Sequence, residues 1–411
     1  MMTFISRQSI RLVQDYLRFF PCVAIVGPRQ CGKTTLVRHL TSDWHHFDLE
    51  KAGDYGQISA DPDLFFRLHP ERAAIDEAQV LPALFPALRV AIDASRSEKG
   101  RFIITGSSSP DLVHAISESL AGRVGVVELS PLSLEEICGG DAPFYDLFND
   151  LEAGAEPLLT LSSRMTLQEI HHYWFHGGYP EPWRVDDEPF SEAWMGQYVQ
   201  TYLDRDIAKL FPGLNTPRFR QFVEMLAGFS GRIVNYAEAA RALGVSQPTT
   251  RDYFHIAHKT FVWRHLPAYA KDVCKRVVKH PKGYLRDSGL LHFLSRIRDL
   301  PHLMGHPSMG ASWESLVVEE LLRGLQNRGV DHDAYHYRTA AGAEVDLVLE
   351  GRFGTLPIEI KYHHDASRKG IRALRDFVRE NNLPLGIVVD NGEHPRRLDE
   401  RLVAVPFSCC L

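Results

Sequence analysis

The sequence predicts an α/β protein of several domains, in which the N-terminal part is a parallel sheet covered by helices. Three observations predict this class. The first 138 residues alternate short apolar runs with helical patterns, as successive β-α-β units do. A helical, aromatic-rich stretch follows, and a mixed α/β pattern returns from about residue 286. With 411 residues the chain is long enough for two or three domains.

The elements of the N-terminal part follow from their apolar runs. A helix is expected at 81–95, and residues 140–165 have the irregular pattern of an insertion or linker. Five strands are expected, at 22–26, 46–49, 72–75, 101–105 and 124–129. Strands that alternate with helices in this way form a parallel sheet with helices on both faces.

Composition argues against several classes of protein. The contents of 44% hydrophobic and 24% charged residues are ordinary for a globular protein. The net charge of −6 argues against a uniformly basic nucleic-acid binder but allows a local basic patch. No apolar run approaches the roughly 20 residues of a membrane span, and no signal peptide is recognisable, so no membrane partner is expected. The six cysteines lack metal-ligand spacing, which favours a reduced, cytoplasmic compartment.

The strand at 22–26 leads into a turn with the spacing of a phosphate-binding loop, and a helix can begin directly after it. Backbone N–H groups and the helix start would form an anion site there. Lys33 would reach the β- and γ-phosphates, and the hydroxyl of Thr34 would hold Mg²⁺. The expected cofactors are therefore ATP and Mg²⁺. The expected nucleotide-binding residues of this loop are Gly27, Pro28, Arg29, Gln30, Cys31, Gly32, Lys33, Thr34 and Thr35.

The strand expected at 72–75 contains the apolar run Ala73-Ala74-Ile75, which ends in two acids. Asp76 would support the Mg²⁺ shell together with Thr34, and Glu77 would polarise the attacking water. This pair turns a nucleotide-binding site into a hydrolytic one. The alternative is that both are surface carboxylates at a strand end.

Two further positions are candidates for the same site. Ser107, with Thr105 as second choice, would sense the γ-phosphate or orient water, unless residues 106–109 serve only as a turn. Arg123 would act as an arginine finger, either within its own chain or on a neighbouring subunit's γ-phosphate, and the second case requires a homo-oligomer. The alternative is that Arg123 braces Glu118 or Glu128.

Four motifs together resemble the AAA+-type ATPases of bacteria and archaea, and in particular the group that carries a C-terminal DUF4143 domain. They are Gly-Pro-Arg-Gln-Cys-Gly-Lys-Thr-Thr at 27–35, Ile-Asp-Glu-Ala-Gln at 75–79, Thr-Gly-Ser-Ser-Ser at 105–109 and Leu-Ala-Gly-Arg at 120–123. Residues 177–180 and 202–206 also match that family's middle segment. The resemblance implies a P-loop NTPase core over 1–140, a linker and helical lid over 141–230, and a C-terminal module.

Residues 231–285 predict a winged helix-turn-helix, with a helix at 237–243, a turn at 244–245 and a second helix capped by Ser246. The start of the second helix would face outward, where such a helix contacts base edges, through Ser246, Gln247, Thr249, Thr250 and Arg251. A basic cluster follows that could hold phosphates: Lys271, Lys275, Arg276, Lys279 and Lys282. Winged helices also serve as lids and docking modules, so DNA and protein both remain open as partners.

The last part, 286–411, carries a second set of acids. A helix is expected at 312–323, and two strands flank a glycine turn at 351–354. Alternation along the first strand would place Val345, Leu347 and Leu349 opposite Asp346 and Val348. A hairpin would then bring Asp346 and Glu359 together, where two carboxylates can bind Mg²⁺ or Mn²⁺. Lys361 would position or activate a water.

This arrangement resembles the PD-(D/E)xK nuclease superfamily, with Asp346, Glu359 and Lys361 at its motif positions and Glu314 as a candidate upstream acid. Val345 stands where the superfamily's motif has proline. The resemblance implies a nuclease-like α/β domain over 286–411, with Asp346 and Glu359 as metal ligands. The alternative is a pair of strands joined by a salt bridge.

Two functional hypotheses follow. In the first, an AAA+ ATPase couples ATP binding and hydrolysis to DNA binding or processing, with a metal-dependent nuclease at its C-terminal end. In the second, an ATP-driven switch binds a protein partner, and the C-terminal fold is a platform without catalysis.

Overall fold

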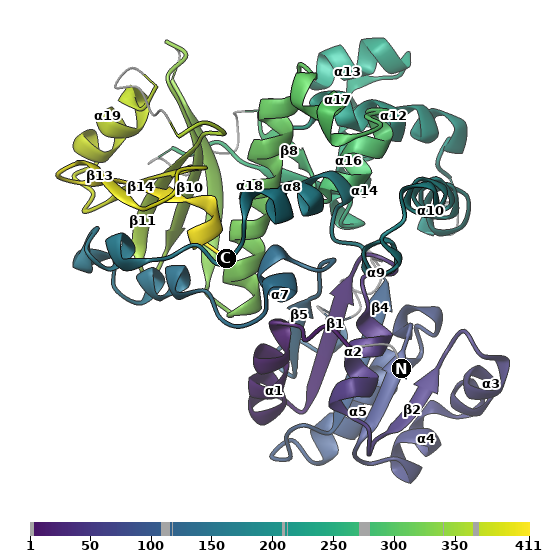
Figure 1. The fold of residues 1–411 in the computed structure, drawn as a ribbon. Helices are drawn as coiled ribbons and strands as arrows, with labels where there is room; N and C mark the ends of the chain where they lie inside the picture. The colour runs from purple at the N-terminus through teal and green to yellow at the C-terminus, as the bar shows by residue number, and fades with distance from the viewer. Residues whose placement is uncertain are drawn as a thin grey trace. The chain divides into compact units, whose positions relative to one another are not determined.

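The structure is a computed structural model that describes residues 4–107, 116, 118–207, 210–211, 213–270, 280–339, 341–364 and 370–411. It contains two compact units (Figure 1). The first unit consists of Met1–Leu132 with the short pieces Tyr179–Glu181 and Lys259–Phe261. The second unit consists of Ser133–Gly178, Pro182–His258 and Val262–Leu411. In the described part of the chain, no helix is both long and apolar enough to cross a membrane.

The first unit is built on a five-stranded sheet in the order β2-β3-β4-β1-β5, in which every neighbouring pair is parallel. This confirms the expected α/β class with a parallel-sheet core. The strands are β1 (Cys22–Gly27), β2 (His45–Asp48), β3 (Ala73–Asp76), β4 (Phe102–Ser107) and β5 (Val124–Glu128). Helices lie between them, as α1 (Ser9–Phe19), α2 (Lys33–Leu40), α3 (Ala52–Ala60), α4 (Pro62–Leu68), η1 (Ala78–Val80) and α5 (Leu84–Ala94).

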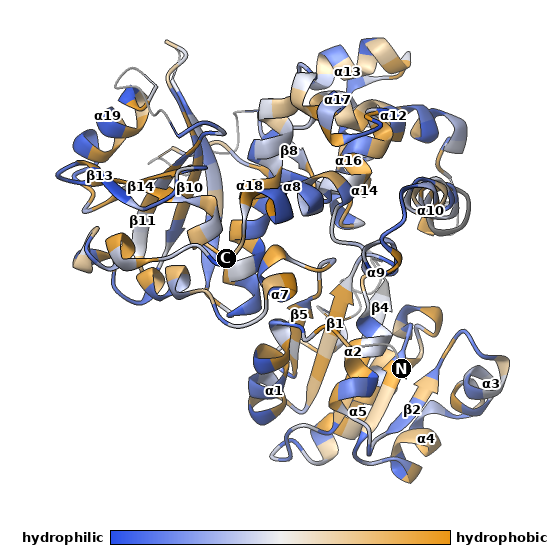
Figure 2. Ribbon diagram, viewed as in Figure 1, coloured by the Kyte–Doolittle hydropathy of each residue, from blue (hydrophilic) through white to orange (hydrophobic). Residues whose placement is uncertain are grey.

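The strand β1 is apolar throughout because both of its faces are covered. Cys22, Ala24 and Val26 belong to one hydrophobic cluster, whereas Val23 and Ile25 belong to another on the opposite face. Alternate side chains of a strand point to opposite faces, so a central parallel strand has no polar side. The hydrophobic colouring of β1 in Figure 2 follows from this burial.

The second unit begins with short helices, and the irregular stretch at 140–165 packs into its core. Phe144, Tyr145, Leu147 and Phe148 are all buried in one cluster with residues of α18 (Met309–Asn327). The elements are α7 (Leu134–Cys138), the 3₁₀ helices η2 (Pro143–Asn149), η3 (Leu151–Ala153) and η4 (Pro157–Thr160), α8 (Leu167–His176), α9 (Pro180–Val185), α10 (Glu188–Thr201) and the π-helix η5 (Tyr202–Ile207).

A module of helices and a small sheet follows. Its helices are α12 (Thr216–Phe229), α13 (Tyr236–Leu243) and α14 (Gln247–Lys259), and its strands are β6 (Arg232–Ile233), β7 (Trp263–Leu266) and β8 (Lys282–Leu285). The sheet is antiparallel in the order β6-β8-β7. Gly244 ends α13 with a positive φ of 64°, and the Ser246 hydroxyl accepts a bond of 3.2 Å from the Thr249 N–H to cap α14.

The last part packs helices against a six-stranded mixed sheet in the order β13-β14-β12-β11-β10-β9. The helices are α16 (Ser288–Leu294), α17 (Leu300–Gly305), α18 (Met309–Asn327), α19 (Arg372–Glu380) and η6 (Phe407–Cys409). The strands are β9 (His332–Arg338), β10 (Glu344–Gly351), β11 (Gly354–Ile360), β12 (Gly386–Asp390), β13 (Arg396–Asp399) and β14 (Leu402–Pro406).

The expected hairpin is present as β10 and β11, but one facing assignment was wrong. Leu347 and Leu349 pack in one hydrophobic cluster, whereas Val345 shares the other cluster with Val348. The pairing of β10 with β9 shifts register between Val345 and Val348. An irregularity of this kind interrupts the strict alternation of side chains, which the sequence pattern could not reveal.

Candidate functional site

The phosphate-binding loop lies between the end of β1 and the start of α2. The loop is held tightly against the residue that follows β5. A Cβ at Gly27 would lie 2.1 Å from the Leu129 carbonyl oxygen, so only glycine fits there. Gly32 has a φ of 101°, and Gln30 also has a positive φ of 60°. Arg29 forms an ion pair of 3.3 Å with Glu50 beside the loop.

Lys33 is buried at this loop, with only 6% of the residue exposed. Its ammonium group donates to the Gly27 carbonyl at 3.1 Å and the Pro28 carbonyl at 2.9 Å. A buried cation with only two carbonyl partners has donor capacity left for phosphate oxygens. The residues therefore fit the phosphates of a nucleotide.

The carboxyl ends of three neighbouring strands bring the other expected groups to the same edge. The Thr34 hydroxyl lies 2.5 Å from Asp76 Oδ2, and the Thr105 hydroxyl donates to Asp76 Oδ1. Because hydroxyl and carboxylate oxygens are the ligands that Mg²⁺ prefers, this cluster fits Mg²⁺. The side chain of Ser107 lies outside the described residues, but its backbone pairs with Gly27.

Glu77 leaves β3 with a left-handed backbone, φ 55°, which is uncommon for a residue with a side chain. Its backbone N–H lies 3.4 Å from the Thr105 hydroxyl, and the Gln79 side chain donates to its carboxylate. The Glu77 carboxylate is thus held by Gln79. Such strain concentrates at functional positions.

Arg123 is held by a carboxylate that neither interpretation of the sequence had named. Its guanidinium makes a bidentate pair with Asp93 on α5, at 2.8 and 2.9 Å. It also donates to the Ala121 carbonyl at 3.0 Å. Asp93 therefore takes the bracing role that the sequence suggested for Glu118 or Glu128.

Sequence reasoning missed Arg7, which joins the phosphate-binding loop to the chain that follows β5. Only 5% of Arg7 is exposed. Its guanidinium donates to the carbonyls of Cys31 at 2.8 Å, Ser130 at 2.6 Å and Pro131 at 3.4 Å. These partners are 24 to 124 positions away in sequence, so no local pattern marks the residue.

In the second unit, three elements bring the predicted C-terminal residues together. Glu314 comes from α18, Asp346 from β10 and Glu359 from β11, and Lys361 follows β11 directly. Lys361 Nζ lies 2.5 Å from Glu359 Oε1, and the Ile360 N–H donates to Asp346 Oδ2 at 2.8 Å. These residues and the two β8 groups described next form the acidic cluster.

The centre of the acidic cluster holds Lys282 of β8, which sequence reasoning had assigned to a phosphate-holding basic patch. That assignment was wrong, because only 3% of Lys282 is exposed. Its Nζ lies 2.6 Å from Glu314, 2.7 Å from Glu344 and 3.6 Å from Asp346. Tyr284, also of β8, donates to Glu314 at 2.6 Å. The other members of the basic patch, Lys271, Lys275, Arg276 and Lys279, lie outside the described residues.

Burial dominates the electrostatics of the acidic cluster. Burial, followed by the charge of Asp346, raises the pKa of Glu314 to about 7 and that of Glu359 to about 8. Burial alone would lower the pKa of Lys282, but Glu314, Asp346 and Glu344 together hold it above its ordinary value. The ammonium of Lys282 is therefore charged at neutral pH.

The expected metal does not fit the acidic cluster as the side chains stand. Among the described residues, no group of three or more His, Cys, Asp and Glu side chains is arranged to hold a metal ion. Lys282 takes the oxygens that a cation would need, and Asp346 Oδ2 already accepts from a backbone N–H. One feature stands apart, because the buried Glu359 Oε2 has no hydrogen-bond partner among the residues that the structure describes.

The start of α14 is exposed at Ser246, Gln247 and Arg251, as expected. Thr250 was wrongly expected to face outward, since it is 0% exposed and donates to the Ser246 carbonyl. It lies one helical turn from the cap, on the face that packs inward. The Arg251 guanidinium lies over the Tyr236 ring at 5.2 Å from its centroid.

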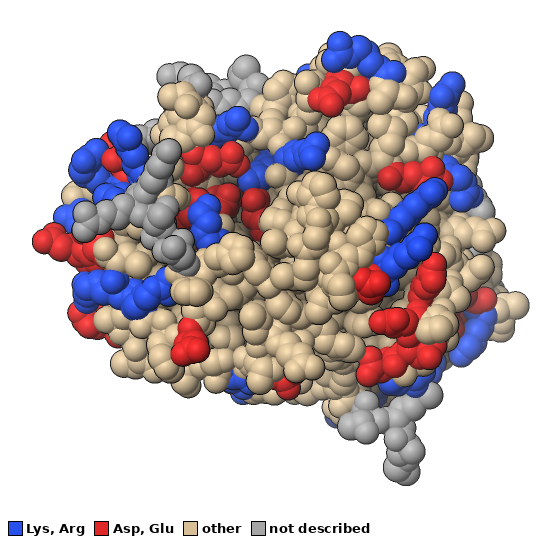
Figure 3. All heavy atoms as spheres, turned by 45° about the horizontal axis from the view of Figure 1, so that its top comes forward, with Lys and Arg blue, Asp and Glu red and all other residues tan. Residues whose placement is uncertain are grey.

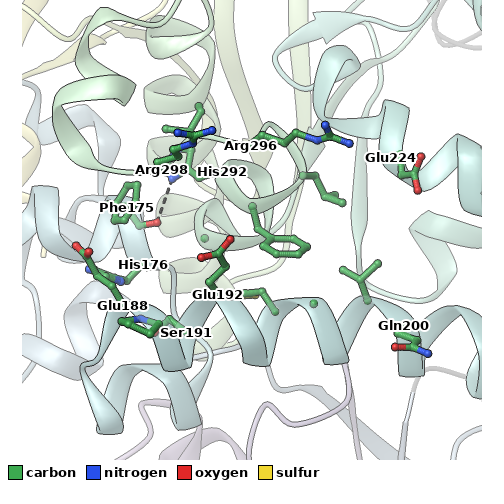
Figure 4. Close-up of a pocket in the computed structure, with 18 of the residues that line it drawn as sticks. Phe175, His176, Glu188, Ser191, Glu192, Gln200, Glu224, His292, Arg296 and Arg298 are labelled. Atoms are coloured by element: carbon green, nitrogen blue, oxygen red, sulfur yellow. Dashed lines mark hydrogen bonds between the residues drawn. The ribbon is translucent and has the colours of Figure 1, made fainter.

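A pocket of about 950 Å³ opens between α8, α10, α12 and α16 in the second unit (Figure 4). Phe175, Met195 and Phe293 supply apolar lining. Exposed glutamates and arginines also line it, so charges of both signs are present. Its buried His292 is already bonded to the Phe175 carbonyl at 3.1 Å and to the Ser312 hydroxyl at 2.7 Å. The lining therefore indicates no single class of ligand.

Three protein-family models match the chain. An AAA domain matches residues 20–138, and DUF4143, a domain of unknown function, matches 309–410. DUF8612, another domain of unknown function, matches 167–300. The two expected family features, the AAA domain and DUF4143, are thereby confirmed.

Similar proteins and structures are also known. The Walker-type ATPase PABY2304 of Pyrococcus abyssi is 15% identical, with 71% of this chain and 96% of that chain covered at a TM-score of 0.42. A signal-transduction ATPase of Pyrococcus horikoshii with a tetratricopeptide repeat sensor is 13% identical, with 80% and 48% covered at a TM-score of 0.28. Both TM-scores are below 0.5, so these likenesses add nothing to the assignment.

The sequence relatives are decisive. The uncharacterized proteins Rv2008c of Mycobacterium tuberculosis and Mb2031c of Mycobacterium bovis are each 36% identical over 402 residues. The match covers 97% of this chain and 83% of each relative. The chain therefore belongs to the family of these mycobacterial proteins, and in this chain an AAA domain is followed by a C-terminal DUF4143 domain.

Proposed function

We propose that the chain hydrolyses ATP and uses the cycle to control DNA handling by its second unit. The observation that carries the ATPase part is the meeting of Lys33, Thr34 and Asp76 at the carboxyl edge of β1 and β3. Bound ATP and Mg²⁺ supply the phosphoryl group and neutralise its charge. The protein's own residues position the phosphates and the metal, and they activate the attacking water.

Lys33 would exchange its bonds to the loop carbonyls for bonds to phosphate oxygens, and Thr34 and Asp76 would orient the metal through oxygen atoms. Glu77 is the proposed base that accepts a hydrogen bond from the attacking water, and Gln79 holds its carboxylate in place. Apart from Pro28, which has no backbone N–H, the remaining loop residues from Gly27 to Thr35 contribute backbone N–H groups.

Nucleotide binding and turnover separate these roles. Lys33→Ala is expected to weaken binding of a fluorescent ATP analogue at least tenfold. Glu77→Gln is expected to keep that affinity while phosphate release falls at least a hundredfold. Full turnover by Glu77→Gln would remove Glu77 from the mechanism.

The proposed oligomer rests on Arg123. Within one chain its guanidinium is bound to Asp93, so a role on a neighbour's nucleotide requires that pair to open. Sedimentation with and without ATP should reveal an ATP-dependent oligomer. Turnover by mixtures of Arg123→Ala and Lys33→Ala chains should exceed that of either variant alone, because each supplies what the other lacks. If mixing gives no gain in turnover, the role of Arg123 is limited to its structural ion pair with Asp93.

DNA is the proposed partner because the module from α12 to β8 has the element order of a winged helix-turn-helix. The start of α14 exposes Gln247 and Arg251. On the face drawn in Figure 3, basic and acidic side chains are interspersed, so binding would be local. Arg251→Ala should weaken duplex binding in fluorescence anisotropy and reduce the salt slope by about one.

Arg372→Ala is the matched control, because this arginine is 80% exposed and lies on α19. Equal effects of both variants would mean that only general charge is measured. Binding to neither duplex nor single strands, together with binding to a protein partner, would favour the alternative switch.

The second candidate function is a metal-dependent nuclease, which the meeting of Glu314, Asp346, Glu359 and Lys361 favours. The occupied centre of the acidic cluster favours a platform without catalysis instead. A gel assay decides between them. Wild type and Asp346→Ala are compared on duplex, branched and single-stranded DNA, with Mg²⁺ or Mn²⁺ and with or without ATP. Cleavage that Asp346→Ala abolishes establishes the nuclease.

The cytoplasm is the proposed compartment. Cys22, Cys31, Cys138, Cys409 and Cys410 are all free thiols in the described part of the chain. Free thiols persist in a reducing compartment.

A further inference from the structure

The strand that supplies Lys282 belongs to a different sheet from the acids that surround it. β8 pairs with β6 and β7, whereas Asp346 and Glu359 lie on the six-stranded sheet. All four residues of β8 are buried. The acidic cluster is therefore closed by a cation from a neighbouring module.

The ammonium of Lys282 lies among the carboxylates of Glu314, Glu344 and Asp346. It contacts Glu314 Oε1 at 2.6 Å and Asp346 Oδ1 at 3.6 Å, and Glu344 Oε1 at 2.7 Å. A divalent cation held by Glu314 and Asp346 would take the same oxygens. Two cations that close in a buried site repel each other strongly.

A second observation shows that Lys282 does not provide a hydrogen-bond partner for every carboxylate oxygen of the acidic cluster. Glu359 is only 5% exposed, and in the described part of the chain no hydrogen-bond partner reaches its buried Oε2. Buried polar atoms are nearly always paired, so this oxygen marks a position for a further positive group or donor. Its other oxygen is taken by Lys361.

We infer that the ammonium of Lys282 and a divalent cation are alternative occupants of one site, formed by Glu314, Asp346 and Glu359. Lys282 is the internal cation of the metal-free protein, and a metal ion enters only when Lys282 withdraws from Glu314 and Asp346. The inference rests on the proposed acidic site of the C-terminal domain, but it does not require cleavage of DNA.

Mn²⁺ binding to the full chain without nucleotide provides the first test, with free Mn²⁺ followed by electron paramagnetic resonance. Lys282→Met keeps most of the side-chain volume and removes the charge. It should bind Mn²⁺ at least tenfold more tightly than wild type, and Asp346→Asn in the same chain should cancel the gain. An unchanged affinity, or a gain that survives Asp346→Asn, overturns the inference. Lys282→Gln serves if Lys282→Met fails to fold.

A second test uses the wild-type chain, so it does not depend on a variant. An amine-acylating reagent followed by mass spectrometry measures how accessible Lys282 is. Millimolar Mn²⁺ should raise labelling of Lys282 several-fold in wild type and leave it unchanged in Asp346→Asn. No rise in wild type overturns the inference.

Neither test measures DNA cleavage, so this inference and the proposed nuclease can fail separately. Metal binding with release of Lys282 but no cleavage would remove the nuclease and keep the alternative occupants. Metal-dependent cleavage that Asp346→Ala abolishes, with Lys282 still protected from labelling, would keep the nuclease and remove the alternative occupants.

Discussion

Arg7→Met tests whether the phosphate-binding loop depends on a residue far from it in sequence. The substitution removes the guanidinium that joins the carbonyls of Cys31, Ser130 and Pro131, and it keeps an apolar stem of similar length. Two of the three bonds are short, at 2.8 and 2.6 Å. The carbonyls would be left buried without a strong partner.

The expected loss of stability in Arg7→Met follows from those two hydrogen bonds. A hydrogen bond from a charged group contributes roughly 1.5–3 kcal/mol, and each orphaned buried carbonyl costs about 1–3 kcal/mol. Allowing for the desolvation that Arg7 itself no longer costs, the first unit should lose about 2–4 kcal/mol of stability. The loop should also lose its fixed shape, so the ATP analogue should bind roughly tenfold more weakly.

Amide hydrogen exchange of the full chain measures the effect locally. Peptides covering β1 and β5 should exchange faster in Arg7→Met, while those of β10 and β11 should not change. Arg18→Met is the matched control, since that side chain is 73% exposed and should change stability by less than about 0.5 kcal/mol. If Arg7→Met behaves like Arg18→Met in both exchange and nucleotide binding, the reasoning is refuted.

Three further predictions concern other parts of the chain. Gly27→Ala should abolish binding of the ATP analogue, because its Cβ would lie 2.1 Å from the Leu129 carbonyl, whereas Gly53→Ala meets nothing within 4 Å and should bind normally. Glu319→Gln should destabilise the second unit by about 3–5 kcal/mol in urea unfolding, because it leaves Arg264 and Arg286 without their shared carboxylate; a loss below about 1 kcal/mol would contradict this. Burial lowers the pKa of His292 from 6.5 to about 4, so the folded state binds fewer protons than the unfolded state between these values. The second unit should therefore lose stability as the pH falls from 6.5 towards 4, and His292→Gln should flatten that slope.

The features that local sequence predicted correctly share one property. The strand β1, its glycine turn and the helix α2 are contiguous, so composition and spacing specify them together. Asp76 and Glu77 end an apolar run, and parallel strands bring their carboxyl ends to one edge by geometry alone. The hairpin of β10 and β11 was predictable for the same reason, because its strands adjoin one glycine turn.

The predictions from sequence were wrong where contacts between distant segments determine which side chains are buried. Val345 changed face because β10 pairs irregularly with β9, and Thr250 turned inward because α14 packs on its own module. Lys282 seemed an exposed basic residue beside Lys279, yet its partners lie 32 to 64 positions further along the chain. Charge in a sequence indicates solvent exposure only until tertiary packing supplies buried partners of opposite sign.

The sequence by itself determined that this protein has a phosphate-binding loop on a parallel sheet and two sets of acids, because each of these depends on near neighbours in the chain. Only the tertiary structure decided what surrounds them. Arg7 ties the loop to the end of β5, Asp93 holds Arg123, and Lys282 fills the acidic cluster. Long-range ion pairs and hydrogen bonds depend on which surfaces meet on folding, and a linear pattern carries no record of that meeting.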